Sequence, residues 1–275
     1  MIRFWKYHGI GNDFVLIENL DLTIPMDPDF VRGVCDRHFG VGADGILYIM
    51  PGVGTDITMR ILNADGSEAE MCGNGIRCVA RHAFENGIVR TRKFTIHTLA
   101  GDMTAKIPES DDFMVEINMG APILDCASIP MGCDGGFLNK TLEVNGLTVT
   151  GNAVSMGNPH FITFDELTDE QILILGPALE SHPLFPRRTN VEFATVMNGK
   201  IRIRVYERGA AWTLACGTGA CATTVAAALN GMVGFNEPVD VHLPGGWLRI
   251  TVDRDLRYVL MAGPAVPVYE GILME

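Results

Sequence analysis

The chain has 275 residues, of which 47% are hydrophobic and 20% charged, with a formal net charge of -12 at pH 7. These values predict a packed globular protein that is long enough for two domains of about 100–150 residues each, and the negative charge disfavours nucleic acid as a partner. No apolar run approaches the ~20 residues of a membrane helix, and the first residues lack the apolar segment of a signal peptide, so we expect a cytoplasmic protein with no membrane partner.

Strand patterns dominate the chain. Short alternating or β-branched runs occur at residues 14–17, 57–61, 114–117 and 201–206. Runs of this length and composition are typical of strands. We therefore expect a fold in which sheets carry most of the structure.

Two helices are predicted among these strands. The first has an apolar face that recurs at i, i+3, i+4, i+7 and i+8 from Ile76 to Phe84, and it stops at Asn86 and Gly87,. The second covers residues 220–229, contains no charged residue and stops at Asn230. A helix that is apolar on all sides is buried on all sides. We expect an α+β fold in which a mixed, barrel-like sheet surrounds a central helix.

The two halves of the sequence resemble each other at an offset of about 144 residues. Matching segments are residues 71–75 with 215–219, 86–89 with 230–233, and His38 with His182. This spacing is too long for a solenoid repeat. It predicts two copies of one domain, residues 1–118 and 119–263, with a tail, residues 264–275, that packs back on the first copy.

Cys72 and Cys216 occupy the same place in the two copies, each in a Cys-Gly-x-Gly motif directly before a helix. The first N–H groups of a helix lack intrahelical partners and carry the positive end of its dipole. Such an end binds a carboxylate and lowers the pKa of a nearby thiol. Two such ends facing each other predict one carboxylate between them, with one cysteine on either face of its α-carbon.

That arrangement suits inversion of an α-carbon. One thiolate removes the α-proton, helix N–H groups stabilise the enediolate, and the other thiol donates a proton to the opposite face. This chemistry requires no metal and no pyridoxal phosphate. The remaining cysteines are expected to be small buried apolar residues, and no Cys-x-x-Cys zinc pair occurs; they are Cys35, Cys78, Cys126, Cys133 and Cys221.

Six motifs in chain order carry a family resemblance. They are residues 8–14, 63–68, 71–78, 156–160, 207–210 and 215–221. Together they resemble the diaminopimelate epimerase family over essentially the whole chain. The resemblance implies conversion of LL- to meso-2,6-diaminopimelate in lysine biosynthesis, without a cofactor, by a homodimer whose two barrel-like domains enclose the site in a cleft.

The resemblance also implies roles for particular residues. By motif match, the substrate is bound by the side chains of Asn12, Asn63, Asn158, Asn190, Glu207 and Arg208 and by the N–H groups of Gly73, Asn74, Gly217 and Thr218. These residue types fit a substrate with a second amino-acid end, since an arginine grips a carboxylate and a glutamate takes an ammonium. His160 either orients or deprotonates one thiol, or is a structural hydrogen-bonding histidine.

Two positions depart from the common family pattern, and other functions remain open. Gly45 stands where many members have Gln, which is expected to leave a gap near the substrate, and Trp212 stands where many have Glu. The nearest alternative is a racemase of another amino acid, such as histidine or proline, on the same scaffold. An isomerase of the phenazine-biosynthesis type is more distant because it is not expected to keep both cysteines. A non-catalytic anion-binding module is the alternative outside enzymes.

Overall fold

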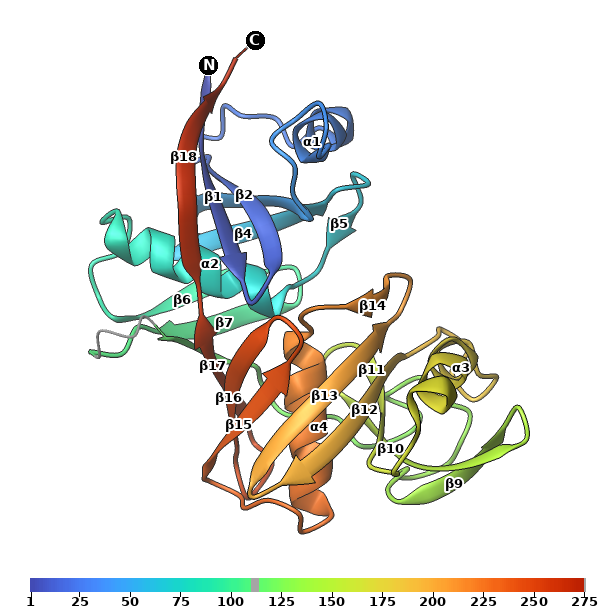
Figure 1. Ribbon diagram of the computed structural model, residues 1–275. Coiled ribbons are helices and arrows are strands. Elements are labelled where there is room, and N and C mark those ends of the chain that lie inside the picture. The colour runs from blue at the N-terminus through green and yellow to red at the C-terminus, as the bar shows by residue number, and fades with distance from the viewer. Residues whose placement is uncertain (110–113, 275) are drawn as a thin grey trace. The chain divides into compact units, whose positions relative to one another are not determined.

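The computed structural model describes residues 1–109 and 114–274, which form eighteen strands and four helices. The chain divides into two compact units, residues 1–118 with 262–275, and residues 119–261 (Figure 1). The predominance of strands and the small number of helices confirm the predicted α+β class. Residue 275, the last of the predicted tail, lies outside the described residues. No described helix is long and apolar enough to cross a membrane.

The first unit contains two helices and nine strands. The helices are α1 (Pro28–Cys35) and α2 (Gly73–Glu85), and the strands are β1 (Ile2–Gly9), β2 (Asn12–Glu18), β3 (Gly45–Pro51), β4 (Ile57–Asn63), β5 (Glu68–Ala69), β6 (Lys93–Thr98), β7 (Gly101–Lys106), β8 (Met114–Asn118) and β18 (Val266–Leu273). β18 pairs with β1 in antiparallel orientation, so the C-terminal segment completes the first sheet.

The second unit contains two helices and eight strands of its own. Its helices are α3 (Asp169–Glu180) and α4 (Gly217–Leu229), and its strands are β9 (Lys140–Val144), β10 (Leu147–Ser155), β11 (Pro159–Thr163), β12 (Asn190–Met197), β13 (Lys200–Glu207), β14 (Ala211–Thr213), β15 (Pro238–Leu243) and β16 (Gly246–Val252). One further strand, β17 (Val259–Pro264), spans the division between the units.

Strand pairing follows the same sequence of orientations in both units. In the first, β1–β2 is antiparallel, β2–β3 parallel, β3–β4 antiparallel, β4–β6 parallel and β6–β7 antiparallel. In the second, β10–β11, β11–β12, β12–β13, β13–β15 and β15–β16 repeat that series. The interpretation of the units as two epimerase repeats remains a prediction, and this shared topology supports it.

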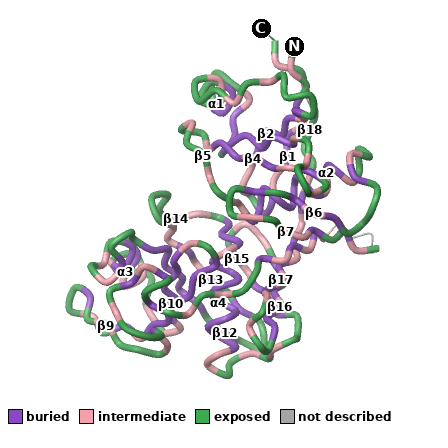
Figure 2. The backbone as a smooth tube through the Cα atoms, turned by 180° about the vertical axis from the view of Figure 1, so that it is seen from behind, coloured by how far each residue is buried: buried purple, intermediate pink, exposed green. Residues whose placement is uncertain are grey.

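Each unit has one central helix. α2 contacts β1, β2, β3, β4, β7 and β8, and α4 contacts β10, β11, β12, β13, β15 and β16. α4 is buried along almost its whole length, as the absence of charged residues predicts (Figure 2),. Both helices begin at the glycine that follows a cysteine. Each unit therefore holds its cysteine thiol at the start of its central helix.

The expectation for two of the cysteines is wrong. Cys126 and Cys133 are joined as a disulfide, with their Cα atoms 5.6 Å apart. The loop between them folds back on itself, since the N–H of Met131 donates to the carbonyl of Cys126 at 2.8 Å. This turn places the two sulfur atoms side by side, which seven residues of sequence separation do not reveal. Cys35, Cys78 and Cys221 form no disulfide and are buried, as expected.

Candidate active site

Cys72 and Cys216 are the N-cap residues of α2 and α4. Both have extended backbone angles, φ -137° and ψ 118° for Cys72 and φ -127° and ψ 102° for Cys216. Each sulfur accepts a hydrogen bond from the N–H of the third helical residue, Gly75 at 3.4 Å and Gly219 at 3.3 Å. The thiols therefore sit where Ser, Thr, Asp or Asn ordinarily caps a helix, and the helix N–H groups favour negative charge there.

The glycine at the third helical position of α4 is required by the thiol itself. A Cβ on Gly219 would lie 2.6 Å from Oε1 of Glu192 and 3.1 Å from Sγ of Cys216. Any larger residue would displace the carboxylate or the sulfur. The second glycine of the motif thus leaves room for the groups around the cysteine.

In the first unit, Asn12 and Asn74 lie against Cys72. The Cys72 thiol donates to Oδ1 of Asn12 at 3.6 Å, and the amide of Asn74 donates to the same oxygen at 3.2 Å. Asn12 comes from the start of β2 and Asn74 from the first turn of α2. Three of the predicted site residues are therefore brought together in this unit.

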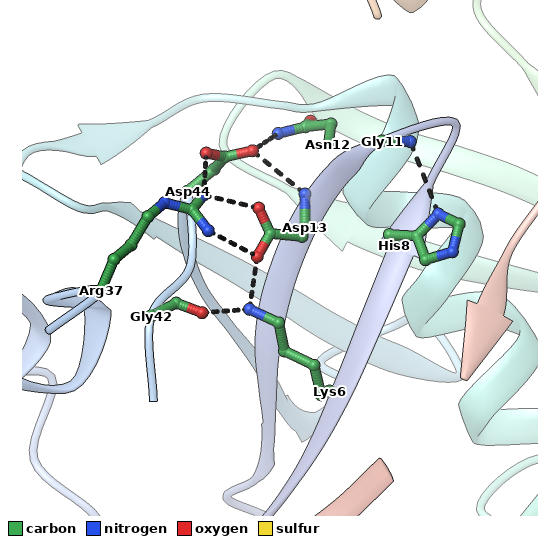
Figure 3. Close-up of polar contacts among 8 residues, drawn as sticks. All are labelled: Lys6, His8, Gly11, Asn12, Asp13, Arg37, Gly42 and Asp44. Carbon is green, nitrogen blue, oxygen red and sulfur yellow. Dashed lines mark hydrogen bonds and ion pairs between the residues drawn. The ribbon is translucent and has the colours of Figure 1, made fainter. Parts of the chain in front are cut away.

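A charged network fixes the orientation of Asn12 (Figure 3). Its amide nitrogen donates to Asp44 at 2.7 Å, which leaves Oδ1 to face Cys72. Arg37 donates to Asp44 at 2.8 Å and to Asp13 at 2.7 Å, and Lys6 pairs with Asp13 as well. Burial raises the pKa of Asp13, but Arg37 and Lys6 outweigh it and hold that pKa below its ordinary value. Asp13 is thus an ionised acceptor at neutral pH.

Arg77 contacts the first turn of α2 through its guanidinium group. Its guanidinium is fully buried and donates to the side chain of Asn74 and to the carbonyl of Gly73, both at 2.9 Å. It also donates to the carbonyl of Pro264 at 3.2 Å. A cation therefore lies one helical turn behind Cys72.

In the second unit, a chain of polar contacts leads to Cys216. The thiol lies 3.6 Å from Oγ1 of Thr218, which accepts from the amide of Asn158 at 3.3 Å. Oδ1 of Asn158 lies 3.0 Å from Nε2 of His160. The structure thus brings three other predicted site residues together around this cysteine.

His160 contacts the carboxylate of Glu192, which was not among the predicted site residues. Its Nδ1 lies 2.6 Å from Oε1 of Glu192, and both side chains are fully buried. Oε2 of Glu192 has no hydrogen-bond partner among the described residues. Both ring nitrogens of His160 have polar partners, so its orientation is set from two sides.

Burial and two carboxylates control the charge of Cys216. Burial raises its pKa well above the ordinary thiol value, and the negative charges of Glu207 and Glu192 raise it further against the Thr218 and Gly219 hydrogen bonds. The pKa of Glu207 is itself raised, chiefly by burial. Cys216 is therefore a protonated thiol at neutral pH, suited to act as an acid.

The remaining predicted residues have other surroundings. Asn190 donates to the carbonyl of Pro159 and accepts from the N–H of Arg208, both at 2.9 Å. The exposed Arg208 side chain donates to the carbonyl of Arg187 at 3.4 Å. Asn63, at the end of β4, donates to Ser67 at 3.0 Å. Asn190 thus holds the backbone of Arg208 in place.

The two unusual positions are both accommodated by their neighbours. A Cβ on Gly45 would lie 2.6 Å from the carbonyl oxygen of Leu62, so the backbone leaves no room for a side chain and the expected gap is absent. Trp212 packs against Phe193 and Tyr206 with ring centroids 6.0 and 5.2 Å apart, as part of the hydrophobic core of its unit.

Three contributors to the site were not found in the sequence. Asp44, Arg77 and Glu192 act through other side chains, and Asp44 and Glu192 belong to no cysteine motif. Glu192 leaves one local signal, a charged residue in the apolar run 191–194. Arg77 leaves a similar one, because it is a charged residue in a segment that is buried from Gly73 to Ala80.

The chain matches the family model of diaminopimelate epimerase over residues 4–124 and 152–268. The chain belongs to the diaminopimelate epimerase family. A diaminopimelate epimerase of Moorella thermoacetica is 47% identical over 276 residues, covering 98% of both chains. Diaminopimelate epimerase 1 of a Nostoc species is 47% identical over 281 residues, covering 99% of both. The resemblance seen in the sequence and the prediction of an amino-acid epimerase are confirmed.

Solved structures with low sequence identity share the fold of this epimerase family member. A phenazine biosynthesis protein of Bacillus anthracis has a TM-score of 0.69 at 17% identity and covers 99% of both chains. A probable proline racemase of Agrobacterium radiobacter has a TM-score of 0.72 at 14% identity, covering 100% of this chain and 93% of its own. At such identities the similarity speaks for the fold alone.

Proposed function

We propose that the chain converts LL-2,6-diaminopimelate to meso-2,6-diaminopimelate with Cys72 and Cys216 as its acid–base pair. The observation that carries this proposal is that both cysteines cap a helix in the same way, each sulfur accepting from the third helical N–H. One such thiol has many explanations. Two in equivalent places of a duplicated topology fit a reaction that treats both faces of one carbon alike.

The reaction moves one proton at each face. A thiolate takes the α-proton, and the electrons of the broken C–H bond move onto the carboxylate as an enediolate. The N–H groups of Gly73, Asn74, Gly217 and Thr218, at the two helix starts, stabilise this charge. The opposite thiol then donates its proton to carbon, which leaves the two sulfur atoms with exchanged protonation states.

The protein supplies an acid for this step on the Cys216 side. Cys216 is a thiol because burial and two carboxylates oppose its ionisation. The reacting carboxylate of the substrate would meet the N–H groups directly after it. Acid, base and anion stabilisation thus all come from the chain itself, without a cofactor.

The substrate assignment rests on relatives and on charge. The relatives above are named diaminopimelate epimerases, and that substrate has an ammonium and a carboxylate at its remote end. Arg208 offers a bidentate grip for this carboxylate. Glu207 and the amides of Asn63 and Asn158 offer acceptors and donors for the ammonium, and Asn190 holds the backbone of Arg208. A cytoplasmic homodimer is part of the same proposal.

Incubation of the purified chain with LL-diaminopimelate in D₂O, followed by chiral analysis and mass spectrometry, tests the function. Early meso product should carry deuterium at the inverted carbon, while recovered substrate stays largely protiated, because the donated proton comes from a thiol that has exchanged with solvent. The rate should be unchanged after dialysis against a chelator and removal of pyridoxal phosphate. If the chain inverts proline or histidine and not diaminopimelate, the substrate assignment is wrong. If the product retains the original α-hydrogen of the substrate, the two-thiol mechanism is wrong.

A further inference from the structure

Three buried side chains of different chemistry meet at the start of α4. One ring nitrogen of His160, one carboxylate oxygen of Glu192 and Sγ of Cys216 lie within 4.8 Å of one another, and all three residues are buried. They come from β11, β12 and the cap of α4. Imidazole nitrogen, carboxylate oxygen and thiolate sulfur are the three ligand types that Zn²⁺ takes in proteins.

Glu192 supplies a second and independent observation. Its side chain is fully buried, Oε1 is engaged by His160, and Oε2 has no hydrogen-bond partner among the described residues. A buried carboxylate oxygen without a donor is costly and calls for a positive partner. Glu207 adds a second carboxylate that acts on Cys216. The cluster therefore holds more acceptors than donors.

The first unit offers a matched pair without these features. His82 lies 2.8 Å from Oε1 of Glu18, and its other ring nitrogen lies 3.3 Å from the hydroxyl of Tyr7. The Glu18 side chain is 30% exposed, so water reaches the carboxylate. Among the described residues, the group with three close ligand types is the one at Cys216.

We propose that His160, Glu192 and Cys216 form a binding site for a thiophilic divalent cation such as Zn²⁺, which inhibits the enzyme by occupying the Cys216 sulfur. On binding, the S–H bond of Cys216 breaks, an S–Zn bond forms and the proton leaves to water. The ligating nitrogen of His160 releases the proton of its present hydrogen bond to water and binds the metal through the lone pair that this frees.

The geometry requires only small movements. Zinc bonds of about 2.0–2.3 Å in a tetrahedral site place ligand atoms roughly 3.5 Å apart. The three ligand atoms here lie within 4.8 Å of one another, and the His160–Glu192 contact is 2.6 Å, so their separations need to change by only about 1 Å,. Three protein ligands leave a fourth position open for water or for an amino group of the substrate. Binding of the ion is independent of the proposed function, whereas its inhibitory effect rests on that function.

Metal binding is measured directly on the metal-free full chain. Zn²⁺ is titrated by calorimetry, and Co²⁺ by absorption, where a sulfur-to-cobalt charge-transfer band reports a thiolate ligand. The site variants are Cys216→Ser and Glu192→Gln, and the matched controls are Cys72→Ala and Glu18→Gln. Circular dichroism checks that each variant is folded. If Glu192→Gln unfolds, the conservative Cys216→Ser variant still tests the site.

The expected result is one tight Zn²⁺ per chain. Cys216→Ser should lose the charge-transfer band, and Glu192→Gln should raise the Zn²⁺ Kd by about 100-fold or more, since loss of an outer-sphere partner alone costs about 10–100-fold. Both controls should bind as the parent does. A band that survives in Cys216→Ser, a band lost in Cys72→Ala, or no tight binding at all would overturn the site.

Inhibition forms a separate arm. Zn²⁺ should abolish epimerisation at the occupancy seen by calorimetry, and a chelator should restore it. Full activity of the zinc-loaded chain would overturn the inhibitory role. A chain that binds zinc at Cys216 but never inverts diaminopimelate would contradict the proposed function and leave the site standing.

Discussion

The starts of α2 and α4 have the same backbone and opposite electrostatics. Behind Cys72 lies the buried guanidinium of Arg77, while Cys216 faces the carboxylates of Glu207 and Glu192. At the repeat offset, Arg77 corresponds to Cys221 and Glu192 to Tyr48. The helix cap is thus the same at the two cysteines, whereas its surroundings differ. For the proposed reaction, which needs one acid and one base at the same time, the two thiols are therefore not equivalent.

The two units also differ at the positions proposed to bind the remote end of the substrate. Glu207 ends β13 and Arg208 follows it in the second unit, and their counterparts in the first are Asn63 and Ala64. The charged pair proposed to bind the remote end of the substrate therefore has uncharged counterparts in the first unit. The first unit contributes amides around its thiol, through Asn12 and Asn74.

Removal of either capping thiol should have the largest effect. Cys72→Ala and Cys216→Ala should each lower the epimerisation rate by about 10³-fold or more, because every turnover needs both an acid and a base. Chiral analysis of the product measures this. Cys78→Ala, which removes a buried thiol whose pKa burial raises to about 12, should keep most of the activity. Near-normal epimerisation by either cysteine variant would refute the proposal that Cys72 and Cys216 act as an acid–base pair.

Arg208→Ala tests whether recognition is confined to the second unit. Loss of the charged partner of the remote carboxylate should reduce kcat/KM by about 2–3 kcal/mol, or roughly 100-fold. Steady-state kinetics with LL-diaminopimelate measure the change. Arg204→Ala, which removes an arginine of β13 that is paired with Asp169 of α3, is the matched control. Equal kinetics of the two variants would remove Arg208 from the site.

Glu207→Gln tests whether nearby negative charge raises the pKa of the Cys216 thiol. Burial and the carboxylates raise the Cys216 pKa, so removal of one negative charge should move the midpoint of its alkylation to lower pH,. Iodoacetamide labelling across pH, read by peptide mass spectrometry, measures both thiols in one sample. The labelling profile of Cys72 is the internal control. An upward shift for Cys216 would contradict the assigned sign.

Asp44→Asn should give the smallest effect. It weakens the acceptor that orients Asn12 and pairs with Arg37 (Figure 3), so kcat should fall by about 5–10-fold, or roughly 1 kcal/mol, while the fold persists,. Asp240→Asn, which removes a surface carboxylate paired with Arg249, should leave kcat unchanged. Kinetics and thermal melts on both variants separate orientation from stability. Equal kcat values would show that Asn12 needs no support from Asp44.

Local patterns were sufficient for the elements that carry the cysteines. The predicted helices at residues 76–84 and 220–229 lie within α2 and α4, and the four predicted strands lie within β2, β4, β8 and β13. α3 was not predicted, although Thr168 and Gln171 form a capping box at its start. Its low amphipathicity explains the omission, because Leu173 and Ile174 on this apolar helix are exposed.

Contiguous residues alone indicated the similarity of the two halves, the two cysteine caps and the family of this protein, because helix-start chemistry depends on neighbours within a few positions. Only the tertiary structure decided the partners of those caps. Glu192 reaches His160 because β11 and β12 run parallel with His160 opposite Asn190, a register set by packing of distant segments. The Cys126–Cys133 disulfide and the oriented amide of Asn12 have the same origin. Their energies depend on burial and on aligned strands, which adjacent residues do not encode.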